Sequence, residues 1–188
     1  MQRIVLASQS PRRKQLLEWA EVAFDIIVPQ TDESFPPGIS INELPIYIAR
    51  EKARSIQSEL SHERIILAAD TVVVLDNKVI GKPTDRADAI HILQQLSGRE
   101  HQVITGVVIL KGEVEVAFAD TTDVTFNQLN KEQIEFYVDK YKPYDKAGAY
   151  AIQEWIGVVG IKNISGDFYN VMGLPVSRVV RELEAIVE

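Results

Sequence analysis

The order of apolar and polar positions along the chain predicts strands alternating with helices. Short runs of consecutive apolar residues, rich in β-branched side chains, are typical of buried strands, whereas apolar residues three or four positions apart indicate the buried face of a helix. The predicted strands cover residues 3–7, 24–28, 65–75, 101–110, 114–126 and 156–164, with a short hairpin arm at 79–80. One predicted helix begins at Ser10-Pro11, and the others cover residues 43–60, 84–96, 130–141 and 174–187. Asn130 with Gln133 resembles a capping box at the start of the helix over 130–141.

These predicted elements mix strand–helix–strand units with hairpins. Asp76-Asn77 and Lys111-Gly112 are typical turn sequences between neighbouring strands. Residues 65–75 (IILAADTVVVL) are the most hydrophobic segment and predict a central buried strand. We therefore expect an α/β fold with a mixed β-sheet flanked by helices. The sequence shows no internal repeat, low-complexity tract or clear linker, so we expect one domain over residues 1–188.

Composition and charge narrow the classes of function. The 188 residues are 46% hydrophobic and 25% charged, as in an ordinary globular protein. The 20 Lys and Arg against 27 Asp and Glu leave a net charge of −7, which argues against a nucleic-acid polymer or an anionic membrane as partner. Because cysteine is absent, disulfides, thiolate metal sites and cysteine nucleophiles are excluded. No apolar run reaches the roughly 18 residues of a membrane span, and the first residues do not form a secretory signal, so we expect a cytoplasmic protein.

A cluster of cations stands at the start of the first predicted helix. The segment SQSPRRK at residues 8–14 places three cations where the helix dipole already carries partial positive charge, at a cost of roughly 0.3–1 kcal/mol each when exposed. An anion bound at this helix end accounts for the arrangement, because backbone N–H groups, serine hydroxyls and guanidinium groups all match a phosphate. A solvated basic turn is the alternative. The combination of strand, tight turn, serine N-cap and paired arginines favours the phosphate.

Asp70-Thr71 lies inside the most apolar run of the chain. A buried carboxylate is costly unless it is hydrogen-bonded, paired or bound to a metal. Its sequence neighbours offer no partner, so compensation must come from elsewhere in the fold. Glu33, in a proline-rich loop, is one candidate to share a divalent ion with Asp70, since Mg²⁺ favours one or two carboxylates plus substrate phosphates. The alternative is an aspartate that caps a loop at the end of a strand.

Three further positions carry weaker signals. Lys52 and Lys82 could each reach a phosphate as a point charge, although either one alone is typical of a surface lysine. Gln153 ends a segment of small residues around Gly148, and its amide could pair with a base edge. Without other information, close backbone packing is the preferred interpretation of that segment. The three histidines lack metal-ligand spacing, and no GxSxG, HExxH or GxGxxG motif is present.

Five motifs follow one another along nearly the whole chain: SxSPRR, AADTVVVLDNKVIGKP, LSGREHQVITGV, YDKAGAYAIQ and ISGDFYNVMGLP. Together they resemble the Maf family of nucleoside triphosphate pyrophosphatases, once described as septum-formation inhibitors. The resemblance implies an elongated α/β fold, similar to that of inosine triphosphate pyrophosphatases, with two lobes around a central cleft. It also implies a homodimer, and hydrolysis of a nucleoside triphosphate to the monophosphate and pyrophosphate with a divalent cation, Mg²⁺ or Mn²⁺.

The resemblance also implies roles for nine residues. The acidic catalytic residue falls on Asp70, and the metal-associated carboxylates on Glu33 and Asp70. The phosphate-contacting positions fall on Ser8, Arg13, Lys52 and Lys82. The positions that divide the substrate classes fall on Arg12, Thr71 and Gln153, and these residue types are similar to those of the subgroup acting on dTTP and UTP. Water would attack the α-phosphorus, and Asp70 would accept its proton.

One departure from the family pattern affects the choice of substrate. The family often has Gly after the glutamine of the fourth motif, whereas this chain has Glu154. An alternative is therefore the same chemistry on a purine or modified nucleotide, such as 7-methyl-GTP. A second alternative, from another class, is a nucleotide-binding regulator of cell division that does not turn its ligand over.

Overall fold

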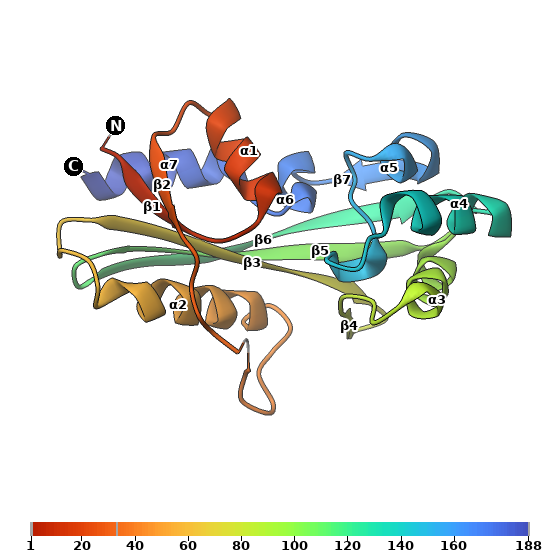
Figure 1. Ribbon diagram of the computed structural model, residues 1–188, viewed down its shortest axis with the longest axis horizontal. Coiled ribbons are helices and arrows are strands. Elements are labelled where there is room, and N and C mark those ends of the chain that lie inside the picture. The colour runs from red at the N-terminus through yellow and green to blue at the C-terminus, as the bar shows by residue number, and fades with distance from the viewer. Residues whose placement is uncertain (1, 33, 188) are drawn as a thin grey trace. The chain divides into compact units, whose positions relative to one another are not determined.

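The computed structural model describes residues 2–32 and 34–187 (Figure 1). Its strands are β1 (Ile4–Ala7), β2 (Phe24–Ile27), β3 (Ile65–Leu75), β4 (Lys78–Ile80), β5 (Glu100–Lys111), β6 (Val114–Phe126) and β7 (Ile161–Ser165). Its helices are α1 (Pro11–Trp19), α2 (Leu44–Gln57), α3 (Arg86–Leu96), α4 (Lys131–Tyr141), the short 3-10 helix η1 (Ala147–Ala149), α5 (Trp155–Gly160), α6 (Phe168–Met172) and α7 (Val176–Val187).

Within the described residues the strands form one open, mixed seven-stranded sheet. Its order is β2-β1-β3-β5-β6-β7, with β4 paired to β3. Strand β1 runs parallel to β2 and β3, whereas β4 and β7 are antiparallel to β3 and β6. The expected mixed sheet flanked by helices is confirmed.

The contacts within the chain divide it into two compact units. Unit 1 comprises Met1–Thr71, Thr105–Asp120 and Gly173–Glu188, and unit 2 comprises Val72–Ile104 and Thr121–Met172. Strands β3, β5 and β6 therefore contribute residues to both units. The expectation of a single domain of two lobes over residues 1–188 stays a prediction.

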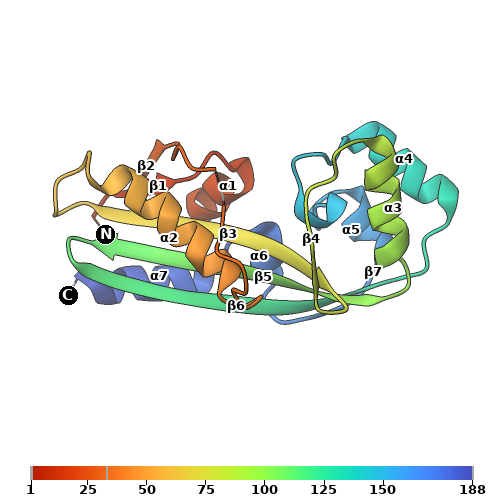
Figure 2. The same cartoon turned by 90° about the horizontal axis from the view of Figure 1, so that it is seen from below.

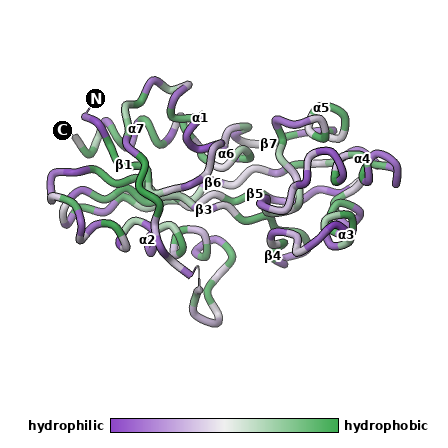
Figure 3. Tube along the Cα trace, viewed as in Figure 1, coloured by the Kyte–Doolittle hydropathy of each residue, from purple (hydrophilic) through white to green (hydrophobic). Residues whose placement is uncertain are grey.

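Unit 1 is built around strands covered by helices on both faces. Helix α2 lies on one face of these strands, and α1 and α7 lie on the other (Figures 1 and 2). Figure 3 shows hydrophilic and hydrophobic residues alternating along α2 and α7, as expected of helices with one buried side. Ala49, Ala53 and Ile56 of α2 belong to the same buried cluster as Val5 and Ile66 of the strands. This packing fixes α2 on the sheet.

A glycine on β5 allows α2 to approach closely. A Cβ atom on Gly106 would lie 2.2 Å from the backbone nitrogen of Ile46, at the beginning of α2. Real Cβ atoms essentially never come within 3.0 Å of another heavy atom. The absence of a side chain at Gly106 therefore sets the position of α2, and with it of every residue that α2 carries.

Unit 2 has a core of helices and aromatic rings. Helix α3 contacts both α4 and η1. The rings of His101, Phe126 and Tyr150 pack edge to face, with centroids 4.9 to 5.5 Å apart. Helix α4 begins with the predicted capping box, in which Asn130 and Gln133 satisfy each other's backbone N–H groups. This prediction from the sequence is confirmed.

The prediction of a strand over residues 156–164 was wrong in its first half. Residues Trp155–Gly160 form α5, and only Ile161–Ser165 form a strand. The backbone N–H groups of Gly157 and Val158 donate to the carbonyl of Glu154, which is a helical turn. A Cβ atom on Gly157 would lie 1.7 Å from the carbonyl oxygen of Ile152, so this tight turn needs glycine.

The predicted helix over residues 174–187 begins two residues later, at Val176. Pro175 disfavours helical backbone at the residue before it, and its carbonyl accepts the N–H groups of Arg178 and Val179 as the helix starts. The short helix α6 was not predicted. Among the described helices, none is long and apolar enough to cross a membrane.

Candidate active site

The N-terminus of α1 has the serine cap and the first-turn proline that the sequence predicted. Ser10 is the N-cap and accepts a hydrogen bond from the backbone N–H of Arg13, and Pro11 occupies the first turn. That turn contains no acidic residue. Ser8, at the end of β1, is 6% exposed, and its Oγ accepts the backbone N–H of Ser10 at 3.1 Å. The cap leaves the positive end of the helix dipole uncompensated by any carboxylate in the first turn.

Three uncharged groups orient the side chain of Arg13. The residue is only 8% exposed. Its Nε donates to the carbonyl of Gly173 at 2.8 Å, Nη2 to Oγ1 of Thr71 at 3.1 Å, and Nη1 to Oγ of Ser8 at 3.5 Å. These contacts hold the guanidinium plane in place, and a planar guanidinium matches the geometry of a phosphate. The preceding residue, Arg12, is intermediate in exposure.

A buried ion pair lies where α2 meets β3. The Nζ of Lys52 donates to Oδ1 of Asp70 at 2.7 Å, and the two side chains are only 11% and 15% exposed. Asp70 stands in the middle of β3, not at its end, so the loop-capping interpretation is wrong. The expectation that a distant segment compensates its charge is confirmed, because Lys52 comes from α2.

Two consecutive residues on β3, Asp70 and Thr71, contact Lys52 and Arg13. Asp70 meets Lys52 on α2, whereas Thr71 meets Arg13 on α1, and these helices cover opposite faces of the strands (Figures 1 and 2). The two-residue period of a strand produces this division. Oγ1 of Thr71 also lies 2.9 Å from Oγ1 of Thr105, which is fully buried on β5. Asp70-Thr71 therefore joins the acid–lysine pair to the arginine through adjacent backbone positions.

Two further predicted residues, Lys82 and Gln153, belong to unit 2. Lys82 follows β4, Gln153 follows η1, and both side chains are exposed. Their segments are linked, because the backbone N–H of Gly148 donates to the carbonyl of Gly81 at 3.1 Å. Gly148 has φ +70°, and a Cβ there would lie 2.9 Å from Cγ2 of Val73. Close packing around Gly148 is confirmed, and convergence of Lys82 and Gln153 with the residues of unit 1 stays a prediction.

The carboxylate oxygens of the candidate site fit a divalent cation that takes its further ligands from substrate phosphates. Glu33 lies outside the described residues. Among residues 2–32 and 34–187, no group of three or more acidic or histidine side chains is gathered for a metal ion. Mg²⁺ commonly takes one or two carboxylates together with substrate phosphates. The carboxylate of Asp70 is a donor of that kind, so the residues present fit such an ion.

Comparison with known proteins identifies the family. The profile of the family described as "Maf-like protein" matches residues 3–186. The chain belongs to the Maf family. The dTTP/UTP pyrophosphatase of Bacteroides fragilis strain YCH46 is 48% identical over 185 residues, covering 98% of this chain and 96% of that protein. The dTTP/UTP pyrophosphatase of Cytophaga hutchinsonii is 49% identical over 181 residues, covering 96% and 83%.

A solved structure gives the same answer for the fold alone. A HAM1 protein from Coxiella burnetii superposes with a TM-score of 0.51 at 18% identity, covering 98% of this chain and 100% of that chain. The expected architecture of this Maf-family chain thus agrees with a known mixed α/β fold.

The structure adds residues that the sequence did not single out. Thr105 orients Thr71, and Gly173 supplies the carbonyl that holds Arg13. Gly173 has φ +116°, a backbone conformation that favours glycine. Both residues lie in motifs of the Maf family, ITGV and VMGLP, but nothing in their chemistry alone predicts that they contact Thr71 and Arg13.

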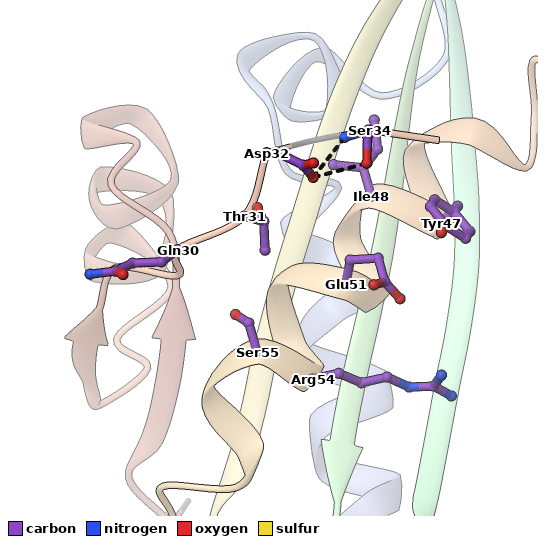
Figure 4. A pocket seen from close by; sticks show the side chains of 9 residues that line it. All are labelled: Gln30, Thr31, Asp32, Ser34, Tyr47, Ile48, Glu51, Arg54 and Ser55. Carbon is purple, nitrogen blue, oxygen red and sulfur yellow. Dashed lines mark hydrogen bonds between the residues drawn. The ribbon is translucent and has the colours of Figure 1, made fainter. Parts of the chain in front are cut away.

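A cavity of about 680 Å³ lies between α2 and the segment that follows β2 (Figure 4). The side chains that line it are mostly polar and come from Gln30, Thr31, Asp32, Ser34, Tyr47, Ile48, Glu51, Arg54 and Ser55. Asp32 accepts hydrogen bonds from the backbone and hydroxyl of Ser34, which hold the pKa of its carboxyl below the usual value. None of the eight predicted site residues that the structure describes is among the lining residues, although Asp32 and Ser34 flank Glu33 in sequence.

Proposed function

We propose that this Maf-family chain is a nucleoside triphosphate pyrophosphatase that hydrolyses dTTP and UTP to the monophosphate and pyrophosphate. It is 48% identical over nearly its full length to a protein named dTTP/UTP pyrophosphatase. The structural observation that carries the proposal is that adjacent residues of β3 engage both cations: Asp70 pairs with Lys52, and Thr71 accepts a hydrogen bond from Arg13. A carboxylate paired with a lysine can act as a base, and lysine and arginine can stabilise the charge that develops on phosphate oxygens.

Each residue has a distinct task in the proposed reaction. Asp70 accepts a proton from the water that attacks the α-phosphorus, and pyrophosphate leaves with the electrons of the broken P–O bond. Arg13 binds phosphate oxygens through its guanidinium group. Lys52 moves from Asp70 toward the developing phosphate charge, which frees the carboxylate to act as a base. A divalent cation supplies Lewis-acid activation and counter-charge when it is bound.

The remaining predicted residues complete the proposal. Ser8 and Lys82 contact phosphate oxygens, Glu33 shares the divalent cation with Asp70, and Arg12, Thr71 and Gln153 select the nucleotide. Hydrogen bonding by Gln153 suits a pyrimidine edge, because an amide both donates and accepts. Nucleoside triphosphates are cytoplasmic metabolites, so we expect the protein to act there. We also expect a homodimer, which light scattering on the purified chain tests.

The decisive experiment measures pyrophosphate release from dTTP, UTP, CTP, dATP, GTP and 7-methyl-GTP, with Mg²⁺, with Mn²⁺ and with a chelator. We expect dTTP and UTP to react fastest and only with a metal ion. Asp70→Asn should lower kcat by about 10²–10⁴-fold. The matched control is Asp76→Asn, because Asp76 pairs with Arg99 at an exposed turn.

Other outcomes would reassign the function. A strong preference for 7-methyl-GTP or a purine would replace the pyrimidine substrates. Tight binding of dTTP without metal-dependent release of pyrophosphate would favour the nucleotide-binding regulator. Equal rates for the wild type and Asp70→Asn would remove Asp70 from the catalytic role.

A further inference from the structure

The carboxylate of Glu154, where the Maf family often has glycine, is engaged on two sides. Its Oε2 accepts a short hydrogen bond from the hydroxyl of Tyr137 on α4. Its Oε1 lies 3.8 Å from Nζ of Lys146, whose side chain is 11% exposed. Glu154 itself is partly buried, with 23% of its side chain exposed. A side chain with two partners at low exposure is a structural element of unit 2 and not a solvated surface group.

Tyr137 connects Glu154 to the backbone ahead of it. The residue is fully buried, and its ring stacks on Tyr141 of the same helix with centroids 5.0 Å apart. While the hydroxyl donates to Glu154, it accepts the backbone N–H of Ala151 at 3.1 Å. One buried phenol oxygen thus uses both its donor and its acceptor on the same short segment.

Gln153 lies inside the turn that these contacts close. The backbone N–H of Glu154 donates to the carbonyl of Ala151 at 3.1 Å, so residues 151–154 form a tight turn. Tyr137 holds both ends of this turn, one through a backbone N–H and the other through a carboxylate. The side chain of Gln153 is exposed between the two held positions.

The residue before this turn is also fixed. The hydroxyl of Tyr150 lies 2.7 Å from Nε2 of His101, and both residues are buried. The ring of Tyr150 packs edge to face against Phe126. The backbone therefore enters the turn from a packed aromatic core, and the contacts of Tyr150, Tyr137 and Glu154 hold the backbone on both sides of Gln153.

We propose that Glu154 and Tyr137 are positioning residues that hold the turn from which the Gln153 amide extends and so set the preference among nucleotide bases. This inference rests on the proposed function, in which Gln153 meets the base. Thymine and uracil present an N–H donor between two carbonyl acceptors. An amide held in one orientation can satisfy a donor and an acceptor of that edge together, and an amide that is free to turn discriminates less.

The test compares kcat/KM for dTTP with kcat/KM for GTP in matched variants. Tyr137→Phe keeps the stacked ring and loses the hydroxyl, and Glu154→Ala loses the carboxylate. Both should lower the dTTP/GTP ratio by about tenfold. Glu154→Gln keeps an acceptor for Tyr137 and should restore most of the ratio. Tyr141→Phe, which removes a hydroxyl from the ring stacked on Tyr137, is the control and should leave the ratio unchanged.

The ratio separates positioning from a purely structural role. A structural role lowers both kcat/KM values equally, and an unchanged ratio in Tyr137→Phe and Glu154→Ala overturns the inference. If Tyr137→Phe fails to fold, Glu154→Ala decides, because its side chain is partly exposed. Wild-type protein that releases no pyrophosphate overturns the proposed function instead, and the ratio of Kd values for dTTP and GTP in the same variants then tests the positioning.

Discussion

The Nζ of Lys52 lies 2.7 Å from Oδ1 of Asp70, and the pair joins helix α2 to the middle of strand β3. Both side chains are largely buried. Removing one partner of such a pair leaves the other charge in a poorly solvated place, whereas removing both leaves no uncompensated charge. We therefore expect the pair to affect stability as well as the proposed reaction.

A double-mutant cycle tests this coupling. We expect Asp70→Asn and Lys52→Met each to lower the free energy of unfolding by about 3 kcal/mol, and the double variant to lose clearly less than the sum. Urea unfolding of the four proteins measures the difference. Strictly additive losses would show that the two charges do not interact in solution. All three variants should be catalytically impaired.

Arg13→Lys should damage both binding and stability. A lysine has no planar fork and cannot contact Ser8, Thr71 and the carbonyl of Gly173 together. Leaving the buried carbonyl without its donor costs about 1–3 kcal/mol. We expect a rise in KM for dTTP and a fall in the urea midpoint.

The control for Arg13→Lys is Lys14→Gln, since Lys14 is in the same turn and its side chain is 51% exposed. This variant should behave as wild type in steady-state kinetics and in urea. Similar behaviour of the two variants would mean that the contacts of Arg13 do not matter.

Gly106→Ala should be strongly destabilising because the new Cβ would meet the backbone of Ile46 at 2.2 Å. The clash displaces the start of α2, so we expect a loss of at least about 3 kcal/mol of unfolding free energy. Gly81→Ala is the matched control, because a Cβ there meets nothing within 4 Å. Thermal unfolding of both variants checks the contrast. If Gly106→Ala folds, displacement of Lys52 should appear as a lower kcat.

The buried His101 should make stability depend on pH. Burial lowers the pKa of His101 from 6.5 to about 4, so the unfolded chain takes up a proton at a higher pH than the folded chain does. The contribution of neutral His101 to the free energy of unfolding is intact above about pH 6.5 and is lost progressively as the pH falls toward about 4. At about 1.4 kcal/mol per pH unit, the full loss approaches about 3 kcal/mol.

His101→Gln removes this titration and tests its size. Its free energy of unfolding should fall less than that of the wild type between about pH 7 and about pH 4.5. His62 and His91 are exposed and serve as controls when replaced in the same way. A fall of the same size in wild type and His101→Gln would contradict the assignment to His101.

Local signals in the sequence predicted much of the fold. The bounds of β3 and β6 agree with the predicted strands, because both are bordered by polar turn residues. The caps at Ser10 and Asn130 agree as well, since capping depends on a side chain and a backbone N–H only three residues apart. The charge of Asp70 also indicated correctly that a distant partner exists.

The features that the sequence did not predict depend on contacts between residues far apart in the chain. The helix at residues 155–160 depends on the contact of Gly157 with Ile152, which no periodicity of apolar residues reveals. The partnership of Thr71 with Thr105 joins strands whose pairing the sequence did not specify. The link between Tyr137 and Glu154 crosses 17 residues and involves residue types that are common at surfaces. These contacts arise only when the sheet is assembled.

The chain passes between the two units four times, after Thr71, Ile104, Asp120 and Met172. Three of these passages occur inside strands and not in linkers. Neither unit is a contiguous stretch, so a single cut of the gene cannot release one of them as an intact piece. Exchanging one unit between homologues would require several splice points, and Thr71 would stand at one of them, immediately after Asp70.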